Sequence, residues 1–395
     1  MASNSLSPGR AGLRSRTISI GEQSFPYYFG ADCITEISGA IADLSPDKLV
    51  IVTDDHLLEL YAAEIERLAG ELPFLTLTHP AGESMKTLSC LSDHLETALR
   101  AGITRRSVVV SFGGGVPGNL AGLLASLLFR GIRLVHVPTT TIAAMDSVLS
   151  LKQAINSGVG KNHIGTFYAP TAIYTDVRLF ATLSERELRS GLCEMAKNCL
   201  AIAPAMLDQL RAVVAAGELA NPQALLWLLD ASIAAKSSVT RHDTFERRAG
   251  LVLEYGHTVG HAIEISDHRV RGTAGIAHGA AIALGMLVAA HISRARGWLS
   301  DDEVSVHYEV VTGLGVEPCL PASVGVADVL AVVADDNKNG YLEPSPDAVP
   351  FVLLRALGRP EHTGDLPLVH VSTSEIREAL EVIAQSRTAA PAVGV

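Results

Sequence analysis

The fold is decided at residues 107–118, where the sequence reads SVVVSFGGGVPG. The β-branched run predicts a buried strand, and Gly113, Gly115 and Gly118 after it match G-x-G-x-x-G. Glycines at such a turn let the backbone approach a pyrophosphate at the N-terminus of the following helix. The same pattern also fits an ordinary tight turn between a strand and a helix. It is not a Walker loop, because Gly-Lys-Ser/Thr does not follow.

The flanking sequence repeats the alternation of strand and helix. Strand patterns read LVIVTDD (49–55), PFLTLTHP (73–80) and RLVHVPTT (133–140), with helical patterns at 56–68 and 88–101. This spacing predicts an α/β, Rossmann-like nucleotide-binding domain with a parallel sheet covered by helices on both faces. Ligands of such sheets bind at the carboxyl ends of the strands. However, the strand at 134–140 lacks the terminal acidic residue of an ordinary Rossmann ribose clamp.

The sequence after Ser184 predicts a mainly α-helical C-terminal domain. Ser184 and Glu187 form a capping-box pattern, and helical patterns follow at 187–200, 204–215, 222–238, 258–265 and 278–295. One late apolar segment, Val349–Leu357, predicts a strand. We therefore expect tails at 1–16 and 387–395, an α/β domain at 17–183 and a helical metal- and substrate-binding domain at 184–386.

Composition excludes several classes of protein. The 395 residues carry 42 acidic and 31 basic side chains, a net charge of −11, with no run of five basic residues, so we expect no nucleic-acid partner. Five cysteines without a CxxC pair indicate a reducing, cytoplasmic environment. No apolar stretch is long enough for a membrane span, and the N-terminal residues lack the hydrophobic block of a secretory signal. Only seven lysines occur, which makes the position of each one informative.

Two groups of polar residues suggest binding sites. Asp54 ends the first strand pattern, and Glu83 and Lys86 lie in a turn after the next one, which together fit contacts to adenosine. In the C-terminal half, His257 and His261 lie one helical turn apart. His278 opens the next helix and Glu194 lies on an earlier one, so a carboxylate and two imidazoles can form a catalytic metal site with an open position. Alternatively, His261 or His268 is a hydrogen-bonded structural histidine, which is the interpretation that we favour for His268.

Seven motifs in a fixed order resemble one family. They are GESMKT (82–87), GGGVPGNLAG (113–122), PTTTIAAMDS (138–147), KNHIGTFYAP (161–170), GLCEMAK (191–197), GHTVGHAIE (256–264) and HGAAIALGM (278–286). Over residues 40–360 the chain resembles the sugar-phosphate cyclases, the family of 3-dehydroquinate synthase.

This resemblance implies bound NAD, one divalent metal (zinc or cobalt) and a small sugar phosphate as substrate, in a homodimer. By position it makes Glu194, His257 and His278 the metal ligands. It assigns the cofactor contacts to Asp54, Glu83, Ser84, Met85, Lys86, Gly115, Val116, Pro117, Gly118, Asn119, Thr139, Thr140, Asp146, Lys161 and Asn162. It assigns the substrate and phosphate contacts to Lys152, Asn162, Lys197, Lys236, His261 and Lys338, the last on the loosest alignment. Lys152, Glu254 and His261 are the candidate catalytic residues, and Asn119 stands where the family commonly has aspartate.

Two departures from the family bear on the substrate. The motif Arg-x-x-Leu-Asn-x-Gly-His, whose arginine meets a substrate carboxylate, reads GLVLEYGH here, with Gly250 for arginine and Glu254 for asparagine. A buried carboxylate without a bidentate partner costs several kcal/mol, so a substrate without a carboxylate is favoured. Residues 145–152, MDSVLSLK, replace the family's more usual Gly-Gly-Lys approach. This pattern resembles the branch of the family that acts on glucose 6-phosphate.

We therefore expect conversion of D-glucose 6-phosphate into 2-deoxy-scyllo-inosose and phosphate, in aminoglycoside biosynthesis. The resemblance implies transient oxidation by NAD, elimination of phosphate, re-reduction and intramolecular aldol closure. Three classes of alternative stay open at this point. The first is another cyclase of the family, acting on sedoheptulose 7-phosphate or as a 3-dehydroquinate synthase. The others are a metal- and NAD-dependent polyol dehydrogenase and a catalytically silent scaffold.

Overall fold

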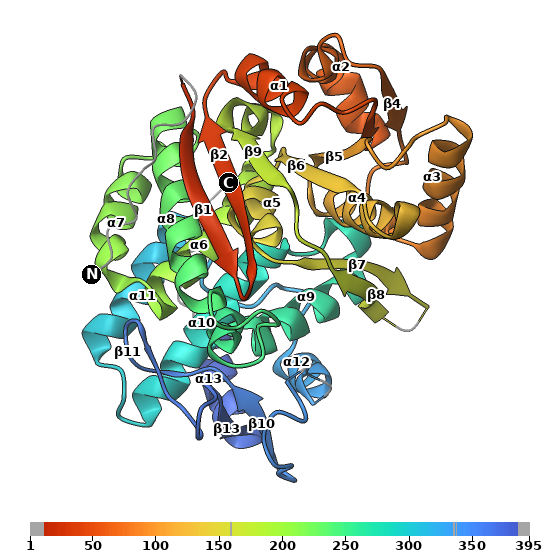
Figure 1. The fold of residues 1–395 in the computed structure, drawn as a ribbon. Helices are drawn as coiled ribbons and strands as arrows, with labels where there is room; N and C mark the ends of the chain where they lie inside the picture. Colours follow the sequence, from red (N-terminus) through yellow and green to blue (C-terminus); the bar gives the residue numbers. More distant parts are fainter. Residues whose placement is uncertain (1–11, 159, 335, 337, 386–395) are drawn as a thin grey trace, which may run out of the picture. The chain divides into compact units, whose positions relative to one another are not determined.

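The computed structural model describes residues 12–158, 160–334, 336 and 338–385, which form two compact units (Figure 1). The first unit contains the described residues up to Leu183 together with Leu225–Ile233. The second contains Ser184–Ala224 and the described residues from Ala234 onward. The sequence predicts helix 222–238 in the C-terminal domain, whereas its central part belongs to the first unit.

The first unit is built on a seven-stranded sheet with the order β1-β2-β9-β6-β5-β3-β4. β1 pairs antiparallel with β2, and every other neighbouring pair is parallel. The strands are β1 (Arg14–Ile20), β2 (Gln23–Gly30), β3 (Leu49–Val52), β4 (Phe74–Leu77), β5 (Val108–Gly113), β6 (Arg133–Pro138) and β9 (Ala172–Asp176). The predicted tail at 1–16 is wrong at its end, because β1 already begins at Arg14. Arg16 in this strand forms a bidentate ion pair with Asp230, at 2.7 and 2.8 Å.

Helices cover both faces of this sheet, as the alternating pattern predicts (Figure 1). Leu49 and Ile51 of β3 pack under α1 (Ile34–Ala42) and α2 (Asp55–Ala69). Val50 and Val52 point the opposite way, toward α3 (Leu88–Arg100) and α4 (Gly115–Leu127). Because successive side chains of a strand point to opposite faces, a fully buried strand is apolar at every position.

The remaining elements of the first unit are short. They are η1 (Glu83–Met85), η2 (Leu128–Arg130), α5 (Thr141–Met145), η3 (Ser147–Leu149), η4 (Val177–Thr182) and an antiparallel hairpin of β7 (Lys152–Ser157) and β8 (Gly160–Phe167). Most of β8 is exposed, so its sequence lacks the apolar alternation that would predict a strand.

The second unit is organised around α10 (His278–Ala295), of which 13 of 18 residues are buried. α6 (Glu185–Ala201), α9 (His257–Arg271), α11 (Asp301–Gly313) and α13 (Thr373–Gln385) pack against it. α6 starts with the predicted capping box of Ser184 and Glu187. The other elements are η5 (Pro204–Met206), α7 (Leu207–Ala215), η6 (Ala249–Glu254), η7 (Gly272–Ala274) and α12 (Val326–Val333), with α8 (Pro222–Thr240) divided between the units.

The predicted single strand at 349–357 is wrong. The segment contains two short strands, β10 (Ala348–Phe351) and β11 (Leu354–Ala356), which pair in different two-stranded sheets. Their partners are β13 (Val369–Ser372) and β12 (Arg359–Pro360). Within the described part of the chain, no helix is both long and apolar enough to cross a membrane.

Candidate functional site

The predicted cofactor residues of the first unit gather along one edge of its sheet. β6, β5, β3 and β4 are consecutive neighbours in the sheet and parallel, so their carboxyl ends lie side by side. Thr139 and Thr140 follow β6, the glycine loop follows β5, Asp54 follows β3, and η1 comes after β4. This is the edge at which open α/β sheets bind nucleotides.

Lys86 links η1 to the β7–β8 hairpin. Its buried ammonium donates to Asn162 Oδ1 at 2.5 Å and lies 3.8 Å from Glu83 Oε1. Asn156 joins the same network, because its Nδ2 donates to Glu83 Oε1 at 2.8 Å and its Oδ1 accepts from Asn162 N at 2.9 Å. Burial lowers the pKa of Lys86, which Glu83 partly opposes and the neighbouring Lys161 reinforces. Asn156 was not among the residues predicted from the sequence.

Both the nitrogen and the oxygen of the Asn119 side-chain amide form hydrogen bonds. Its Nδ2 donates to Gly115 O at 2.8 Å, and its Oδ1 accepts from Ala154 N at 2.7 Å. The side chain therefore joins the first turn of α4 to β7. An aspartate could accept from Ala154 but could not donate to Gly115.

The two threonines after β6 differ in their contacts. Thr140 caps α5, accepting from Ala143 N at 3.2 Å. Thr139 Oγ1 is buried and has no hydrogen-bond partner among the described residues. A hydroxyl of this kind is available to a ligand, since a buried polar atom without a partner is costly.

Glu194, His257 and His278 converge in the second unit from three helices. Glu194 Oε1 lies 3.7 Å from His257 Nε2 and 3.5 Å from His278 Nε2. This oxygen is buried and, within the described chain, has no hydrogen-bond partner. A carboxylate oxygen close to two imidazole nitrogens is a donor set that fits a divalent metal such as zinc or cobalt.

The outer nitrogens of both imidazoles are held by oxygen atoms. His278 Nδ1 lies 2.8 Å from Glu264 Oε2, and His257 Nδ1 lies 3.3 Å from Tyr255 O. Each Nδ1 can therefore donate a proton to its oxygen, which leaves the Nε2 of either ring as the atom that can bind a metal. Glu264 was missed by sequence reasoning, although it ends the motif GHTVGHAIE.

Two glycines bring these helices close together. A Cβ at Gly279, next to His278, would lie 2.0 Å from Ser190 O on α6, and Gly279 N donates to Ser190 Oγ at 2.9 Å. Gly256, just before His257, has φ +80°, and a Cβ there would lie 2.8 Å from Ile282 O on α10. Side chains at these positions would push the metal-ligand candidates apart.

Charges around this cluster are strongly coupled. Lys197 Nζ donates to Glu194 Oε2 at 2.5 Å, and both side chains are buried. Burial opposes ionisation of Glu194, but Lys197 and the histidines hold its pKa well below the usual range. Burial lowers the pKa of His257 and of His261 to about 4. Burial also opposes the charge of His278, whose pKa the carboxylates Glu194 and Glu264 nonetheless raise to about 10.

Glu254 belongs to the same charged cluster. Its Oε2 lies 3.4 Å from Lys338 Nζ, and Lys338 Nζ lies 2.9 Å from Asp336 Oδ1. Burial raises the pKa of Glu254, but Lys338, followed by His257 and His261, holds it well below the ordinary value. Glu254 is therefore a carboxylate beside the metal-ligand candidates.

Models of two protein families match the chain in succession. The model described as 3-dehydroquinate synthase N-terminal matches residues 76–190, and the one described as 3-dehydroquinate synthase C-terminal matches residues 191–339. The chain belongs to the 3-dehydroquinate synthase family.

Relatives within this family are similar over nearly the whole chain. The 2-deoxy-scyllo-inosose synthase of Streptomyces ribosidificus is 48% identical over 380 residues, 95% of each chain. A crystal structure of 2-deoxy-scyllo-inosose synthase complexed with carbaglucose-6-phosphate, NAD+ and Co2+ is 32% identical, with a TM-score of 0.83 over 93% of this chain and 99% of that one. The 2-epi-5-epi-valiolone synthase from Streptomyces hygroscopicus subsp. jinggangensis 5008, with NAD+ and Zn2+ bound, is 24% identical with a TM-score of 0.77 over 94% and 99%, a likeness of fold.

The other residues assigned by the resemblance to the 3-dehydroquinate synthase family are divided between the two units. Asp146, the exposed Lys152 and the exposed Lys161 lie in the first unit. Lys236 lies buried on α8 in the part of that helix that belongs to the second unit. His268 makes a structural contact, since its Nε2 lies 2.9 Å from Ile276 O, as the sequence favoured.

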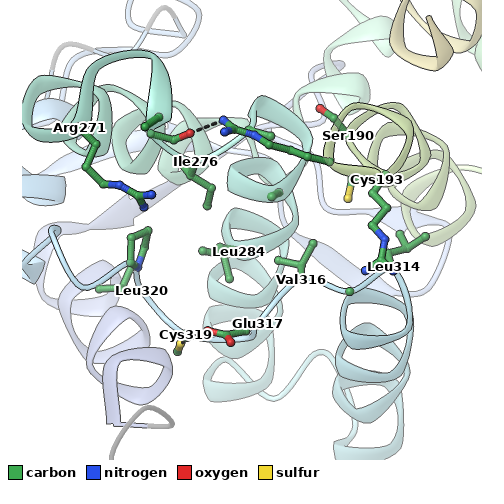
Figure 2. A pocket seen from close by; sticks show the side chains of 18 of the residues that line it. Ser190, Cys193, Arg271, Ile276, Leu284, Leu314, Val316, Glu317, Cys319 and Leu320 are labelled. Atoms are coloured by element: carbon green, nitrogen blue, oxygen red, sulfur yellow. Dashed lines mark hydrogen bonds between the residues drawn. The ribbon is translucent and has the colours of Figure 1, made fainter. Parts of the chain in front are cut away.

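A separate cavity of about 550 Å³ lies in the second unit of this family member (Figure 2). Figure 2 shows the side chains of Ile276, Leu284, Val316 and Leu320 around it. None of the predicted metal, substrate or catalytic residues of the described chain lines this cavity. This cavity is therefore not part of the candidate site, which consists of the polar side chains described above.

Proposed function

We propose that this enzyme converts D-glucose 6-phosphate into 2-deoxy-scyllo-inosose and phosphate, as a step in aminoglycoside biosynthesis. The observation that carries the proposal is the pairing of Glu254 with Lys338 beside the metal-ligand candidates, in a site with glycine at position 250. The 48% identity to a 2-deoxy-scyllo-inosose synthase over 95% of both chains supports the same substrate.

Position 250 holds a glycine and therefore supplies no cationic side chain to bind a substrate carboxylate. Gly250 N donates to Asp243 Oδ2 at 2.9 Å, and a Cβ at this position would lie 3.0 Å from the same oxygen. Asp243 also accepts from Arg248 N at 2.6 Å, so the carboxylate is fixed in place. An arginine fork at position 250 would have to displace this turn, which favours a substrate that carries no carboxylate.

NAD would supply reversible hydride transfer, and a divalent metal would polarise a substrate oxygen. In this proposal Glu194, His257 and His278 hold the metal, and the cofactor residues named from the sequence hold the nucleotide. Glu254 accepts hydrogen bonds from the neutral hydroxyls of the sugar. His261 moves protons between the substrate and solvent.

The phosphate needs compact positive charges. We assign the phosphate to the lysines named from the resemblance, because ammonium groups bind phosphate as point charges. The side-chain amide of Asn162 is assigned with them. These residues are Lys152, Asn162, Lys197, Lys236 and Lys338. Lys152 also stays a candidate for acid–base contacts.

We also propose that the enzyme works as a cytoplasmic homodimer. All five cysteines lie in the described residues and none forms a disulfide there, which supports a reducing compartment. Sedimentation of the purified protein at several concentrations tests the dimer, and a monomer at every concentration would contradict it.

One assay tests the reaction. The protein is incubated with NAD, Co2+ or Zn2+ and one sugar phosphate, while inorganic phosphate and NADH are both measured. With glucose 6-phosphate we expect release of phosphate without net NADH, because the hydride returns to the product. Turnover with sedoheptulose 7-phosphate but not glucose 6-phosphate would reject the substrate, and net NADH without phosphate would indicate a dehydrogenase.

A further inference from the structure

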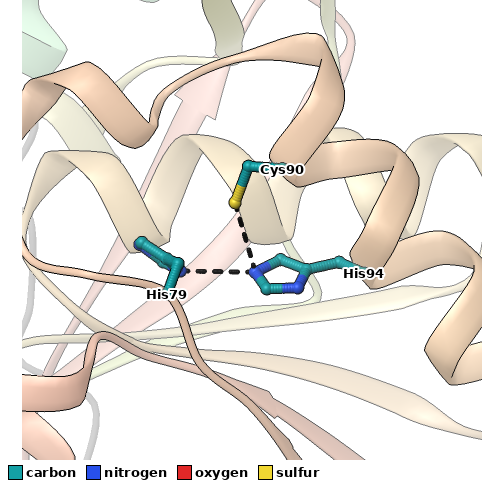
Figure 3. Close-up of side chains that lie close together, drawn as sticks. All are labelled: His79, Cys90 and His94. Carbon is teal, nitrogen blue, oxygen red and sulfur yellow. Dashed lines mark hydrogen bonds between the residues drawn. The ribbon is translucent and has the colours of Figure 1, made fainter.

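Three buried side chains with metal-binding atoms meet in the first unit, whereas the predicted metal ligands belong to the second (Figure 3). His79 follows β4, and Cys90 and His94 lie one turn apart on α3. Their exposed fractions are 3%, 6% and 5%, respectively. One ligand atom of each lies within 4.8 Å of the other two.

Two of the three distances between the ligand atoms match the edges of a tetrahedral site. Zn–N and Zn–S bonds imply about 3.4 Å between two nitrogens and about 3.6 Å between a nitrogen and a sulfur. His79 Nδ1 lies 3.3 Å from His94 Nε2, and Cys90 Sγ lies 3.7 Å from the same nitrogen. Figure 3 shows the ring nitrogen of His79 and the sulfur of Cys90 both directed at His94 Nε2.

Hydrogen bonding alone satisfies this arrangement poorly. His94 Nε2 has one position in the plane of its ring, which holds either a proton or a lone pair. It therefore makes one good hydrogen bond, although both His79 and Cys90 approach it. A cation between the three atoms would bind all of them at once.

We propose that His79, Cys90 and His94 bind a second divalent metal of the zinc or cobalt class, with a fourth position for a small ligand such as water. Two imidazoles and a thiolate are a donor set typical of these metals. Burial lowers the pKa of His79, and lowers that of His94 to about 4, so both imidazoles keep a lone pair at neutral pH. Burial raises the pKa of the Cys90 thiol, and the metal would displace its proton.

The position of this site gives the metal a structural role. His79 and Cys90 flank residues 80–89, which include Glu83 and Lys86 of the predicted cofactor site. His79 O also accepts from Asp55 N at 3.0 Å, at the start of α2. The second metal would fasten both ends of this loop to the carboxyl edge of the sheet.

Cobalt spectroscopy separates the two sites, because only the second contains a thiolate. The purified full-length protein is stripped of metal and titrated with Co2+, while bound metal and the near-ultraviolet spectrum are recorded. We expect about two Co2+ per chain and a thiolate-to-cobalt charge-transfer band. One Co2+ per chain without this band in the wild-type protein would overturn the proposal.

Three variants locate the band. Cys90→Ala is expected to lose the band and about one Co2+, whereas Cys33→Ala, which removes another buried thiol of the same unit, keeps both. His257→Ala is expected to lose one Co2+ and keep the band. A band that persists in Cys90→Ala would overturn the assignment, and the wild-type spectrum decides the question even if a variant fails to fold.

Discussion

Glu194 Oε1 lies 3.5 Å from His278 Nε2, so a carboxylate in the middle of α6 faces the first residue of α10. The contact depends on how closely the two helices approach. Gly279 N donates to Ser190 Oγ at 2.9 Å, one turn before Glu194 on α6. The metal-ligand candidates are thus positioned by a glycine that carries no functional group.

Gly279→Ala is expected to destabilise the protein by about 1–3 kcal/mol, because a methyl group 2.0 Å from Ser190 O forces the helices apart. Bound Co2+ should fall in parallel, since His278 moves with α10. Chemical unfolding and metal analysis measure both effects. Gly118→Ala, where a Cβ meets nothing within 4 Å, is the matched control. Normal stability of Gly279→Ala would contradict the role of this contact.

Glu264→Gln is expected to weaken metal binding by about 10–100-fold, because the glutamine no longer fixes and polarises His278 as a carboxylate does. Equilibrium dialysis with Co2+ measures the affinity. Glu381→Gln removes an exposed carboxylate of α13 and should have no effect. Equal affinity in Glu264→Gln and wild type would show that the 2.8 Å contact does not support the metal.

Lys86→Ala is expected to raise the Kd for NAD about tenfold or more, because it removes a charged donor from the network with Glu83 and Asn162. Metal bound at Glu194, His257 and His278 should stay unchanged, since Lys86 and these residues belong to different units. Calorimetric titration with NAD is the measurement. The control is Lys48→Ala, which removes a lysine that donates to Ala101 O. An unchanged NAD affinity would exclude Lys86 from the cofactor site.

Glu254→Gln is expected to lower kcat about 100-fold or more while metal content stays normal, because a neutral amide is a weaker hydrogen-bond acceptor for the sugar hydroxyls than a carboxylate. Lys338→Met should also impair turnover, since it leaves Glu254 without its ammonium partner at 3.4 Å. A double-mutant cycle should show coupling between the two positions. Wild-type kcat in Glu254→Gln would refute its role.

Acid should weaken the second unit through Glu375. Its hydrogen bond to Arg296, at 2.7 Å, lowers the pKa of Glu375 from 4.5 to about 2. A carboxyl with a lowered folded-state pKa stabilises the protein above its unfolded pKa and loses that contribution as pH falls toward the folded value. The stability difference between wild type and Glu375→Gln should therefore shrink from pH 4.5 toward pH 2 in urea unfolding. A difference that is constant with pH would contradict this.

Local sequence patterns predicted where helices begin and which polar residues lie at one edge of the sheet. His278 opens α10 as expected, and the capping box of Ser184 and Glu187 starts α6. Asp54 and Lys86 both follow parallel strands at one edge of the sheet. Periodicity carries this information because burial on a helix or strand repeats with the local geometry.

Local sequence patterns could not predict contacts between segments that are distant in the sequence. Glu264 meets His278 only because α9 and α10 pack together, and Asn119 reaches Ala154 across 35 residues. His79 lies in the loop after β4 and Cys90 and His94 lie on α3, so no short motif marks their meeting. The predicted strand at 349–357 failed for a related reason, since an apolar run records burial but not the partner of each strand.

The division of α8 has a consequence for engineering. Leu225–Ile233 belongs to the first unit, where Asp230 pairs with Arg16 and Ser232 Oγ donates to Met145 O at 2.7 Å. A fragment cut after Leu183 would lack these partners and leave Arg16 without its carboxylate. The two halves of the sequence therefore cannot be exchanged by a single cut after Leu183. A chimaera with another member of the family should take residues 225–233 from the same parent as the N-terminal unit.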